Sequence, residues 1–119
     1  MKKIILSALL MGLCGVVFAD QKADAEALKI ATNAGCMTCH SVEPKTDGKL
    51  PIGPAWKDVA KKYKGDKAAV ARLTKEVMTG TNLYDSHWKG KVSGVAMPPN
   101  AVAIKEADAK KLVAWITAL

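Results

Sequence analysis

Apolar residues recur at helical spacing near the C-terminus and predict an amphipathic helix over 105–119. The residues that form this apolar face are Ala109, Leu112, Val113 and Ile116. We expect the face to pack against the first predicted helix, where that helix passes Ala31 and Gly35. Trp115 is expected to cover the core rather than to carry chemistry.

The first helix is predicted over about 22–35, where Ala, Lys and Glu are frequent. Its residues at helical spacing are Ala27, Ile30, Ala31 and Ala34. Small side chains along one side suit close contact with another helix, although a plain surface helix would look similar. Gly35 is expected to end the helix.

Two further helices are predicted over 56–63 and 66–79, with a break at Gly65. Asp66 is a suitable N-cap for the second of them, and Gly80 is a suitable stop. The residues expected on its inward face are Val70, Leu73, Val77 and Met78.

The remaining stretches are predicted to be loops. Three prolines and two glycines fall between residues 41 and 54, and such a density of both residue types breaks regular structure. No convincing periodicity runs from Gly80 to Gly94. The chain should therefore carry two long loops between its helices.

Residues 1–19 have the layout of a cleaved secretory signal peptide, with two lysines, a short apolar run and Ala19 at the expected cleavage point. A retained membrane anchor is disfavoured because the apolar run is shorter than the roughly 20 residues of a comfortable span. Cys14 raises the alternative of a lipoprotein signal. Such signals have a small residue before the cysteine, whereas this chain has Leu13, so Cys14 is read as part of the apolar run.

Cleavage would leave residues 20–119 as one domain and, with the two N-terminal lysines gone, reduce the net charge from +7 to +5. A domain of this size buries only a modest core. Its aromatic residues are Trp56, Tyr63, Tyr84, Trp88 and Trp115. A large flat cofactor would supply the apolar surface that so few rings cannot, and the chain without it should fold poorly. Nucleic-acid binding is poorly supported, because the protein is expected to be exported and its basic residues lack interleaved aromatics.

The segment Cys36-Met37-Thr38-Cys39-His40 has the spacing of a c-type haem attachment site. Each thiol can add to one of two vinyl groups on the same edge of a porphyrin, and the histidine that follows reaches the iron from one face. Two other uses of such a cysteine pair were weighed. A thiol–disulfide motif does not require His40, and a zinc site would need ligands beyond Cys14 and His87.

The loop that ends at Pro54 is expected to supply a hydrogen-bond acceptor for His40. A ligating imidazole needs an acceptor for its second ring nitrogen, which fixes the tautomer and makes the ligand more basic. The carbonyl of Pro54, in the rigid stretch 51–54, is our candidate. The alternative is a simple turn before the next helix.

A second chemical landmark is Met97, followed by Pro98, Pro99 and Asn100. Two prolines lower the entropy lost when the loop is ordered by a weak thioether ligand. Asn100 could donate a hydrogen bond to the sulfur. Met37 lies inside the attachment motif and Met78 on a helical stripe, so Met97 is the methionine expected to ligate iron. The alternative is an exposed loop methionine.

Taken together, these motifs resemble those of small monohaem bacterial class I cytochromes c, over essentially all of residues 20–119. The closest resemblance is to the short periplasmic carriers that donate to nitrite reductases and terminal oxidases. The resemblance implies an all-α fold of four to five helices around one covalently bound haem c. The site residues that it implies are Cys36 and Cys39 as thioethers, His40 and Met97 as axial ligands, the Pro54 carbonyl on the histidine, and Asn100 near the sulfur.

One departure from the family concerns the loop from Gly80 to Met97, which is longer than in its shortest members. The family usually places a tryptophan in this loop against a haem propionate, and Trp88 is the candidate. His87 could compete as an iron ligand, although a solvent-exposed loop histidine is the favoured reading.

Ligation by a histidine and a methionine fills every position on the iron, so the predicted function is one-electron transfer and not enzyme catalysis. A haem enzyme or gas sensor with a labile sixth ligand is the alternative, and a thiol oxidoreductase is a more distant one. We expect a periplasmic monomer without a stable membrane anchor, docking transiently on acidic patches of redox partners. The lysines that could steer this docking are Lys57, Lys61, Lys62, Lys64, Lys67, Lys75, Lys89 and Lys91; the alternative is that they are solvated residues without a docking role.

Overall fold

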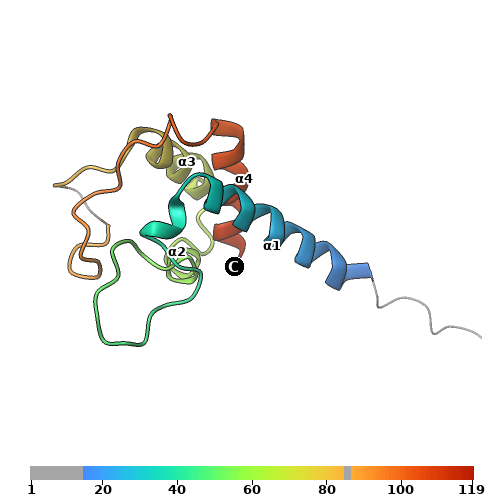
Figure 1. The fold of residues 1–119 in the computed structure, drawn as a ribbon, viewed down its shortest axis with the longest axis horizontal. Coiled ribbons are helices and arrows are strands. Elements are labelled where there is room, and N and C mark those ends of the chain that lie inside the picture. Colours follow the sequence, from blue (N-terminus) through green and yellow to red (C-terminus); the bar gives the residue numbers. More distant parts are fainter. Residues whose placement is uncertain (1–14, 85–86) are drawn as a thin grey trace, which may run out of the picture.

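A computed structural model describes residues 15–84 and 87–119, with side chains from Asp20 onward. Over these residues the chain contains helices and loops and no strand, so the all-α prediction is confirmed. The elements are α1 (Gly15–Asn33), a 3-10 turn η1 (Cys36–Thr38), α2 (Trp56–Lys62), α3 (Ala69–Thr79) and α4 (Glu106–Ala118), as shown in Figure 1. Cys14 and most of the predicted signal peptide lie outside the described residues.

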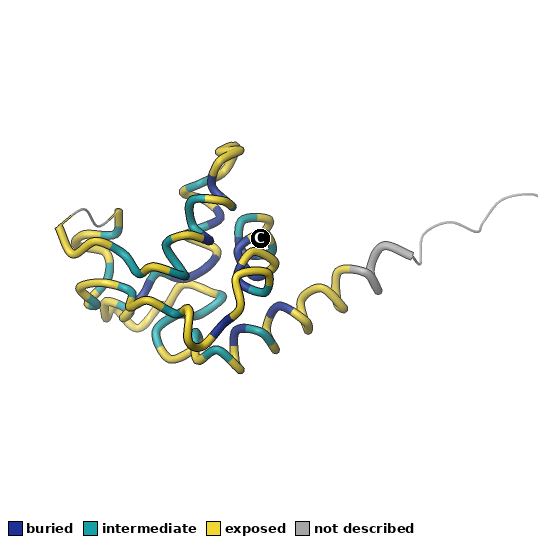
Figure 2. Tube along the Cα trace, turned by 90° about the horizontal axis from the view of Figure 1, so that it is seen from above, coloured by how far each residue is buried: buried dark blue, intermediate teal, exposed yellow. Residues whose placement is uncertain are grey.

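The core forms where α4 packs against α1, α2 and α3. The apolar face predicted for α4 is confirmed, since all four of its residues are buried. On α1 the contact is made by Ala27 and Ala31, and neither Ala31 nor Ala109 of α4 has any exposed surface. Alanines at both positions allow the helices to approach closely, and Figure 2 shows buried positions on α1 as well as on the elements packed in the body of the molecule.

Gly35 does not take part in that crossing, contrary to the prediction. It is exposed, and a Cβ at this position would meet no atom within 4 Å. Its φ of 75° lies in the left-handed region, where glycine is unstrained. Gly35 therefore turns the chain from α1 into η1 and makes no helix contact.

Helix α1 begins earlier than predicted, at Gly15 instead of about residue 22. The intervening sequence contains no proline and no further glycine, so nothing in it breaks a helix. Among the described residues, no helix combines the length and apolarity required to cross a membrane.

Helix α2 matches its prediction, but α3 begins at Ala69 and not at Asp66. The Asp66 carboxylate accepts the N–H of Ala68 at 2.9 Å and pairs with Arg72 at 2.6 Å. Asp66 thus stabilises the turn before the helix, and its prediction as N-cap was wrong. The predicted inward stripe of α3 is only half-buried, because Leu73 and Val77 face a cavity.

The two long loops lie at the end of the molecule away from the free part of α1 (Figure 1). Backbone hydrogen bonds join them, since Ser93 N–H donates to Pro51 at 2.8 Å and Gly94 N–H donates to Ile52 at 3.0 Å. A Cβ on Gly94 would lie 2.5 Å from the Ile52 oxygen. Glycine is therefore required where these loops meet.

Candidate functional site

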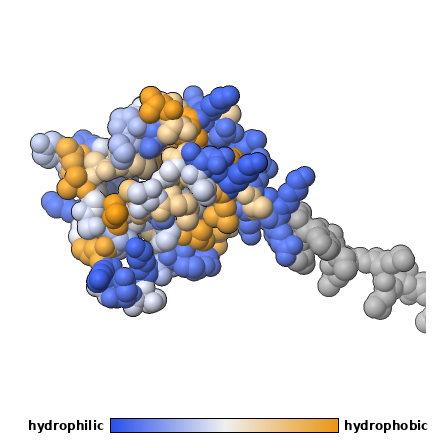
Figure 3. Space-filling model, viewed as in Figure 1, coloured by the Kyte–Doolittle hydropathy of each residue, from blue (hydrophilic) through white to orange (hydrophobic). Residues whose placement is uncertain are grey.

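A cavity of about 360 Å³ opens between the attachment motif, helices α2, α3 and α4, and the two loops. Most of its wall is apolar. The apolar side chains come from every one of these elements and include Ile52, Val59, Leu73, Val77, Val113 and Ile116. On the face shown in Figure 3, apolar patches alternate with hydrophilic ones.

His40 enters this cavity directly after η1. Its Nδ1 lies 2.8 Å from the carbonyl oxygen of Pro54, and the predicted hydrogen bond is therefore present. A carbonyl can only accept, so the proton must be on Nδ1 and the lone pair on Nε2. Nε2 is then the nitrogen available to a metal.

Burial lowers the pKa of His40 below its ordinary value, and the bond to Pro54 offsets part of this effect. The neutral imidazole, which is the ligating form, is therefore favoured. Gly53 is packed so closely that a Cβ there would lie 2.7 Å from the imidazole Cε1. Only glycine fits at this position without displacing the ring.

The two cysteines of the motif lie in and just after η1, and both thiols are free. Cys39 lines the cavity, whereas Cys36 is half-buried against the core. Burial raises the pKa of Cys36, and this is the largest cause of its shift. The N–H groups of Cys39 and His40 both donate to the Cys36 carbonyl, which holds the motif in a tight turn.

Met97 also lines the cavity, from the other long loop. Its backbone is held twice by Thr81, because the Met97 N–H donates to the Thr81 Oγ1 at 2.8 Å and its carbonyl accepts the Thr81 N–H at 3.0 Å. Thr81 was not predicted from the sequence, where its position directly after Gly80 is the only signal. In the structure Gly80 has a φ of 80° and lies next to Met97 and Pro99.

Asn100 lies outside the cavity wall and acts on the loop. Its side-chain amide donates to the carbonyls of Pro98 at 2.7 Å and Val77 at 3.2 Å. The expected bond to the Met97 sulfur is not among the hydrogen bonds that the structure gives this amide. A role of Asn100 at the sulfur therefore stays a prediction.

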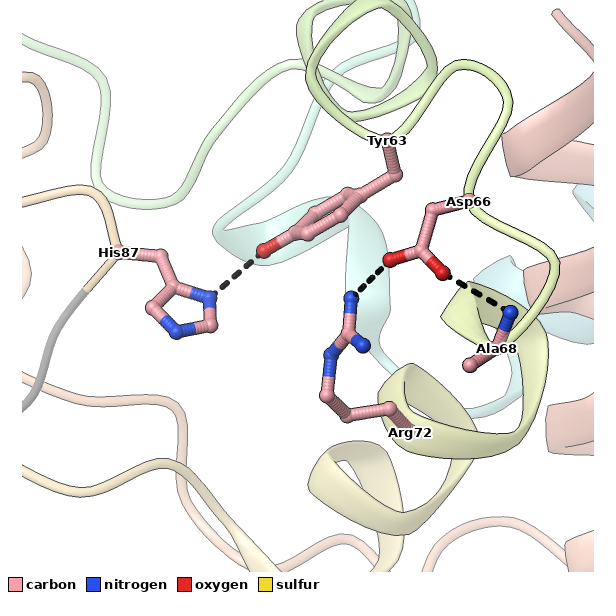
Figure 4. A network of polar contacts seen from close by, with 5 residues as sticks. All are labelled: Tyr63, Asp66, Ala68, Arg72 and His87. Carbon is pink, nitrogen blue, oxygen red and sulfur yellow. Dashed lines mark hydrogen bonds and ion pairs between the residues drawn. The ribbon is translucent and has the colours of Figure 1, made fainter.

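The loop before Met97 is fixed to the C-terminal end of α2. The hydroxyl of Tyr63 and Nδ1 of His87 share a hydrogen bond of 2.7 Å. Lys62 Nζ donates to the His87 carbonyl at 2.9 Å. The same ammonium group lies 5.0 Å from the centroid of the Trp88 ring. Figure 4 shows Tyr63 between His87 and Arg72. Both His87 and Trp88 line the cavity. The contacts that Tyr63 and Lys62 make with this loop were not predicted from the sequence.

The donor set and the lining fit a large apolar group attached through the motif. Cys39 supplies a thiol at the wall, His40 supplies a nitrogen lone pair, and Met97 supplies a thioether, all toward one apolar space. Such a mixture of one imidazole and one thioether is a known donor pair for haem iron. Of the seven predicted site residues, the structure brings together at the cavity Cys39, His40, Pro54, Trp88 and Met97.

Comparison with known proteins agrees with these observations. Residues 25–119 match the family model described as Cytochrome c. The chain is 46% identical over 92 residues to cytochrome c-551 of Allochromatium vinosum, covering 77% of this chain and 84% of that protein. It is 37% identical over 119 residues to cytochrome c-552 of Hydrogenobacter thermophilus, covering 100% and 99%. The crystal structure of wild-type Nitrosomonas europaea cytochrome c552 superposes with a TM-score of 0.61 at 36% identity, covering 77% of this chain and 98% of that one.

Proposed function

The chain belongs to the cytochrome c family, and from this premise we propose that it is a diffusible periplasmic carrier whose single haem is ligated by His40 and Met97. At the level of the family, it is an electron carrier with one covalently bound haem c, and it is not an enzyme. The axial ligands, the compartment and the partners are the parts that we propose.

The observation that carries the proposal is the convergence of His40 and Met97 on one apolar cavity. They lie 57 positions apart in the sequence, yet the His40 ring is held by the Pro54 carbonyl and the Met97 backbone by the Thr81 hydroxyl next to that space. Cys36 and Cys39 would hold the haem through thioethers. The Pro54 carbonyl keeps the His40 proton on Nδ1 and so leaves Nε2 for the metal.

When bound, haem iron supplies an Fe(III)/Fe(II) couple. Two protein ligands leave no coordination position for a substrate, and thioether ligation raises the reduction potential. The apolar side chains around the cavity exclude water from the site. Hydrogen bonds fix the His40 ring and the backbone of Met97 beside the cavity, and ligands that move little on oxidation or reduction would suit fast electron transfer.

A basic hollow next to the cavity supports docking on acidic partners. Its charged lining residues are Lys61, Lys62, Lys91 and one carboxylate, Asp58, so positive charge is in excess. It shares Pro54, Trp88 and Val92 with the cavity wall. Positive charge beside an electron-transfer site steers association with negatively charged surfaces and makes it sensitive to salt. This hollow, rather than all eight lysines, is the docking surface that we propose. Lys57, for example, forms an ion pair with Glu43.

Export is the second part of the proposal. Residues 1–19 would direct the chain across the cytoplasmic membrane and be removed, leaving a soluble monomer of residues 20–119. The sequence pattern of this segment supports it. N-terminal sequencing of protein from the periplasmic fraction tests it, with Asp20 as the expected first residue.

Visible spectra of the purified protein, oxidised and reduced, test the proposed ligation. We expect a Soret band and, in the ferric protein, the weak sulfur–iron charge-transfer band near the red end of the spectrum. A haem without that band, combined with rapid binding of cyanide or carbon monoxide, would support a haem enzyme or gas sensor instead. A protein without Soret absorption would contradict every haem-based function.

A further inference from the structure

Trp56, the first residue of α2, packs against the imidazole of His40. The ring centroids are 6.1 Å apart and the ring planes are inclined by 23°. Trp56 is only 3% exposed, and its backbone N–H donates to the carbonyl of Ser41 at 2.9 Å. Its backbone is thus fixed to the residue directly after the histidine.

Trp56 is itself held by a second tryptophan. Trp115 of α4 meets it edge-on, with centroids 5.7 Å apart and planes at 87°, a favoured arrangement for two aromatic rings. The Trp115 indole N–H donates to a carboxylate oxygen of Asp24 on α1 at 2.7 Å. A hydrogen bond to a carboxylate is stronger than one between neutral groups. Three successive contacts therefore connect the outer surface of α1 with the imidazole.

The plane of the His40 ring is set by rotation about its Cβ–Cγ bond. The hydrogen bond to the Pro54 carbonyl restrains this rotation, but a hydrogen bond tolerates a wide range of angles. The backbone at Gly53 limits the ring where a Cβ would approach Cε1, Nδ1 and Nε2. The stacked ring of Trp56, which also lines the cavity, adds a further restraint on the plane of the imidazole.

We propose that Trp56 is a positioning residue that sets the plane of the His40 imidazole, and that Trp115 and Asp24 keep Trp56 in place. This inference rests on the proposed function, because it takes His40 to be an iron ligand. The orientation of a ligating histidine is controlled by residues that contact it without touching the metal, and those residues tune the metal centre. Here the controlling group is an indole face, supported by a hydrogen bond from a different helix.

The test uses the oxidised holoprotein and its paramagnetic NMR spectrum. The shifts of the four haem methyl groups depend on the plane of the axial imidazole, so they report orientation rather than stability. In Trp56→Leu, which removes the ring, we expect the order or spread of these shifts to change and the reduction potential to move. Trp56→Phe keeps a smaller ring and should show a partial change.

Asp24→Ala tests the hydrogen bond between Asp24 and Trp115 and has a matched control. Glu26→Ala also removes an acidic residue of α1 that reaches α4, in this case through an ion pair of 3.3 Å with Lys111. We expect Asp24→Ala to move the haem methyl shifts severalfold more than Glu26→Ala. Trp115→Phe, which keeps a ring but loses the N–H, should resemble Asp24→Ala.

The outcomes distinguish a failure of the proposed iron ligation from a failure of the positioning role of Trp56. A parent spectrum without the upfield-shifted methyl group of a ligated methionine would overturn the proposed ligation. A normal parent spectrum, with methyl shifts unchanged in Trp56→Phe, Trp115→Phe and Asp24→Ala, would overturn the positioning role alone. These three variants decide the question even if Trp56→Leu fails to fold.

Discussion

The two long loops of this protein perform matching tasks by different physical means. The attachment segment, residues 36–56, carries His40, and the methionine loop, residues 80–100, carries Met97. In the attachment segment Gly53, Ala55 and Trp56 are buried. In the methionine loop none of the described residues is buried. The proposed ligand His40 is therefore supported by the core, whereas the proposed ligand Met97 is supported mainly by polar contacts.

The polar contacts of the methionine loop come from neighbouring elements. Thr81 holds the Met97 backbone, Asn100 binds the end of α3, and Tyr63 and Lys62 hold His87. Hydrogen bonds of this kind each contribute about 0.5–1.5 kcal/mol. Segments with few buried contacts open at low free-energy cost. We infer that the iron–sulfur bond itself supplies much of the order of this loop.

Removing that bond gives the largest expected effect. Met97→Ala should abolish the sulfur–iron band completely, allow the ferrous protein to bind carbon monoxide, and lower the free energy of unfolding, because a loop with few buried contacts loses the bond that we infer to order it. Visible spectroscopy and denaturant titration of the holoprotein measure the three effects.

Met37→Ala is the matched control for that variant. Met37 lies inside the attachment motif and is 39% exposed, so its loss should leave the band and the carbon monoxide response unchanged. If Met37→Ala abolished the band while Met97→Ala kept it, the ligand assignment would be wrong.

Two glycines compare the rigidity of the loops directly. A Cβ on Gly53 would lie 2.7 Å from the His40 ring, and a Cβ on Gly94 would lie 2.5 Å from the Ile52 oxygen. Overpacking costs about 1–3 kcal/mol where neighbours cannot move. We expect Gly53→Ala to reach this range, because its surroundings are buried, and Gly94→Ala to cost less, because the methionine loop can shift. Denaturant unfolding of both holoproteins checks this order, and the reverse order would contradict the comparison.

The sequence predicted the attachment segment better than the methionine loop, for the same physical reason. Attachment chemistry depends on local spacing, so Cys36, Cys39, His40 and the Pro54 carbonyl could be placed from neighbouring residues alone. The α4 face was predicted because burial leaves a clear periodic pattern. Contacts such as Thr81 with Met97 or Tyr63 with His87 join residues far apart in the chain and leave no periodic signal.

The errors at helix ends have the same origin. Asp66 is a residue type that often caps helix N-termini, but its carboxylate forms an ion pair with the nearby Arg72, and the helix starts three residues later. Gly35 suited a close helix contact by size, yet its left-handed φ was the property that the fold uses. A residue type alone does not distinguish such roles.

A smaller effect is expected where α2 holds the methionine loop. Tyr63→Phe removes the hydrogen bond to His87, worth about 0.5–1.5 kcal/mol, and should therefore favour loop opening about 2- to 10-fold. The rate at which the ferric holoprotein binds cyanide should rise by this factor, because cyanide enters after the sulfur leaves. Stopped-flow absorbance measures the rate.

Tyr84→Phe provides the control for that measurement. Tyr84 lies in the same loop and is 94% exposed, so the loss of its hydroxyl should leave the cyanide rate unchanged. Equal rates in the parent and in Tyr63→Phe would show that the bond to His87 does not restrain the loop.

The smallest effect is expected at the ion pair of Arg72 and Asp66, next to the Tyr63 ring. Arg72 lies 5.4 Å from the centroid of the Tyr63 ring and pairs with Asp66 (Figure 4). The hydrogen bond from Arg72 is the main cause that lowers the pKa of Asp66, and the N–H of Ala68 adds to it. A carboxylate whose pKa is lowered by folding stabilises the native state above its unfolded pKa, near 3.9. That stabilisation is lost as the pH falls through the lowered pKa of the folded protein.

Asp66→Asn should therefore make the free energy of unfolding less dependent on pH below about 4, and leave a slightly less stable protein at neutral pH. Because both side chains of the pair are partly exposed to solvent, high salt should reduce the difference between parent and variant. Asp47→Asn is the control, since Asp47 accepts the N–H of Lys49 at 3.0 Å in a similar turn but lies outside the Arg72 pair. If parent and Asp66→Asn lost stability in parallel as the solution was acidified, Arg72 would hold Tyr63 through its ring contact alone, and the carboxylate would have no part in restraining the methionine loop.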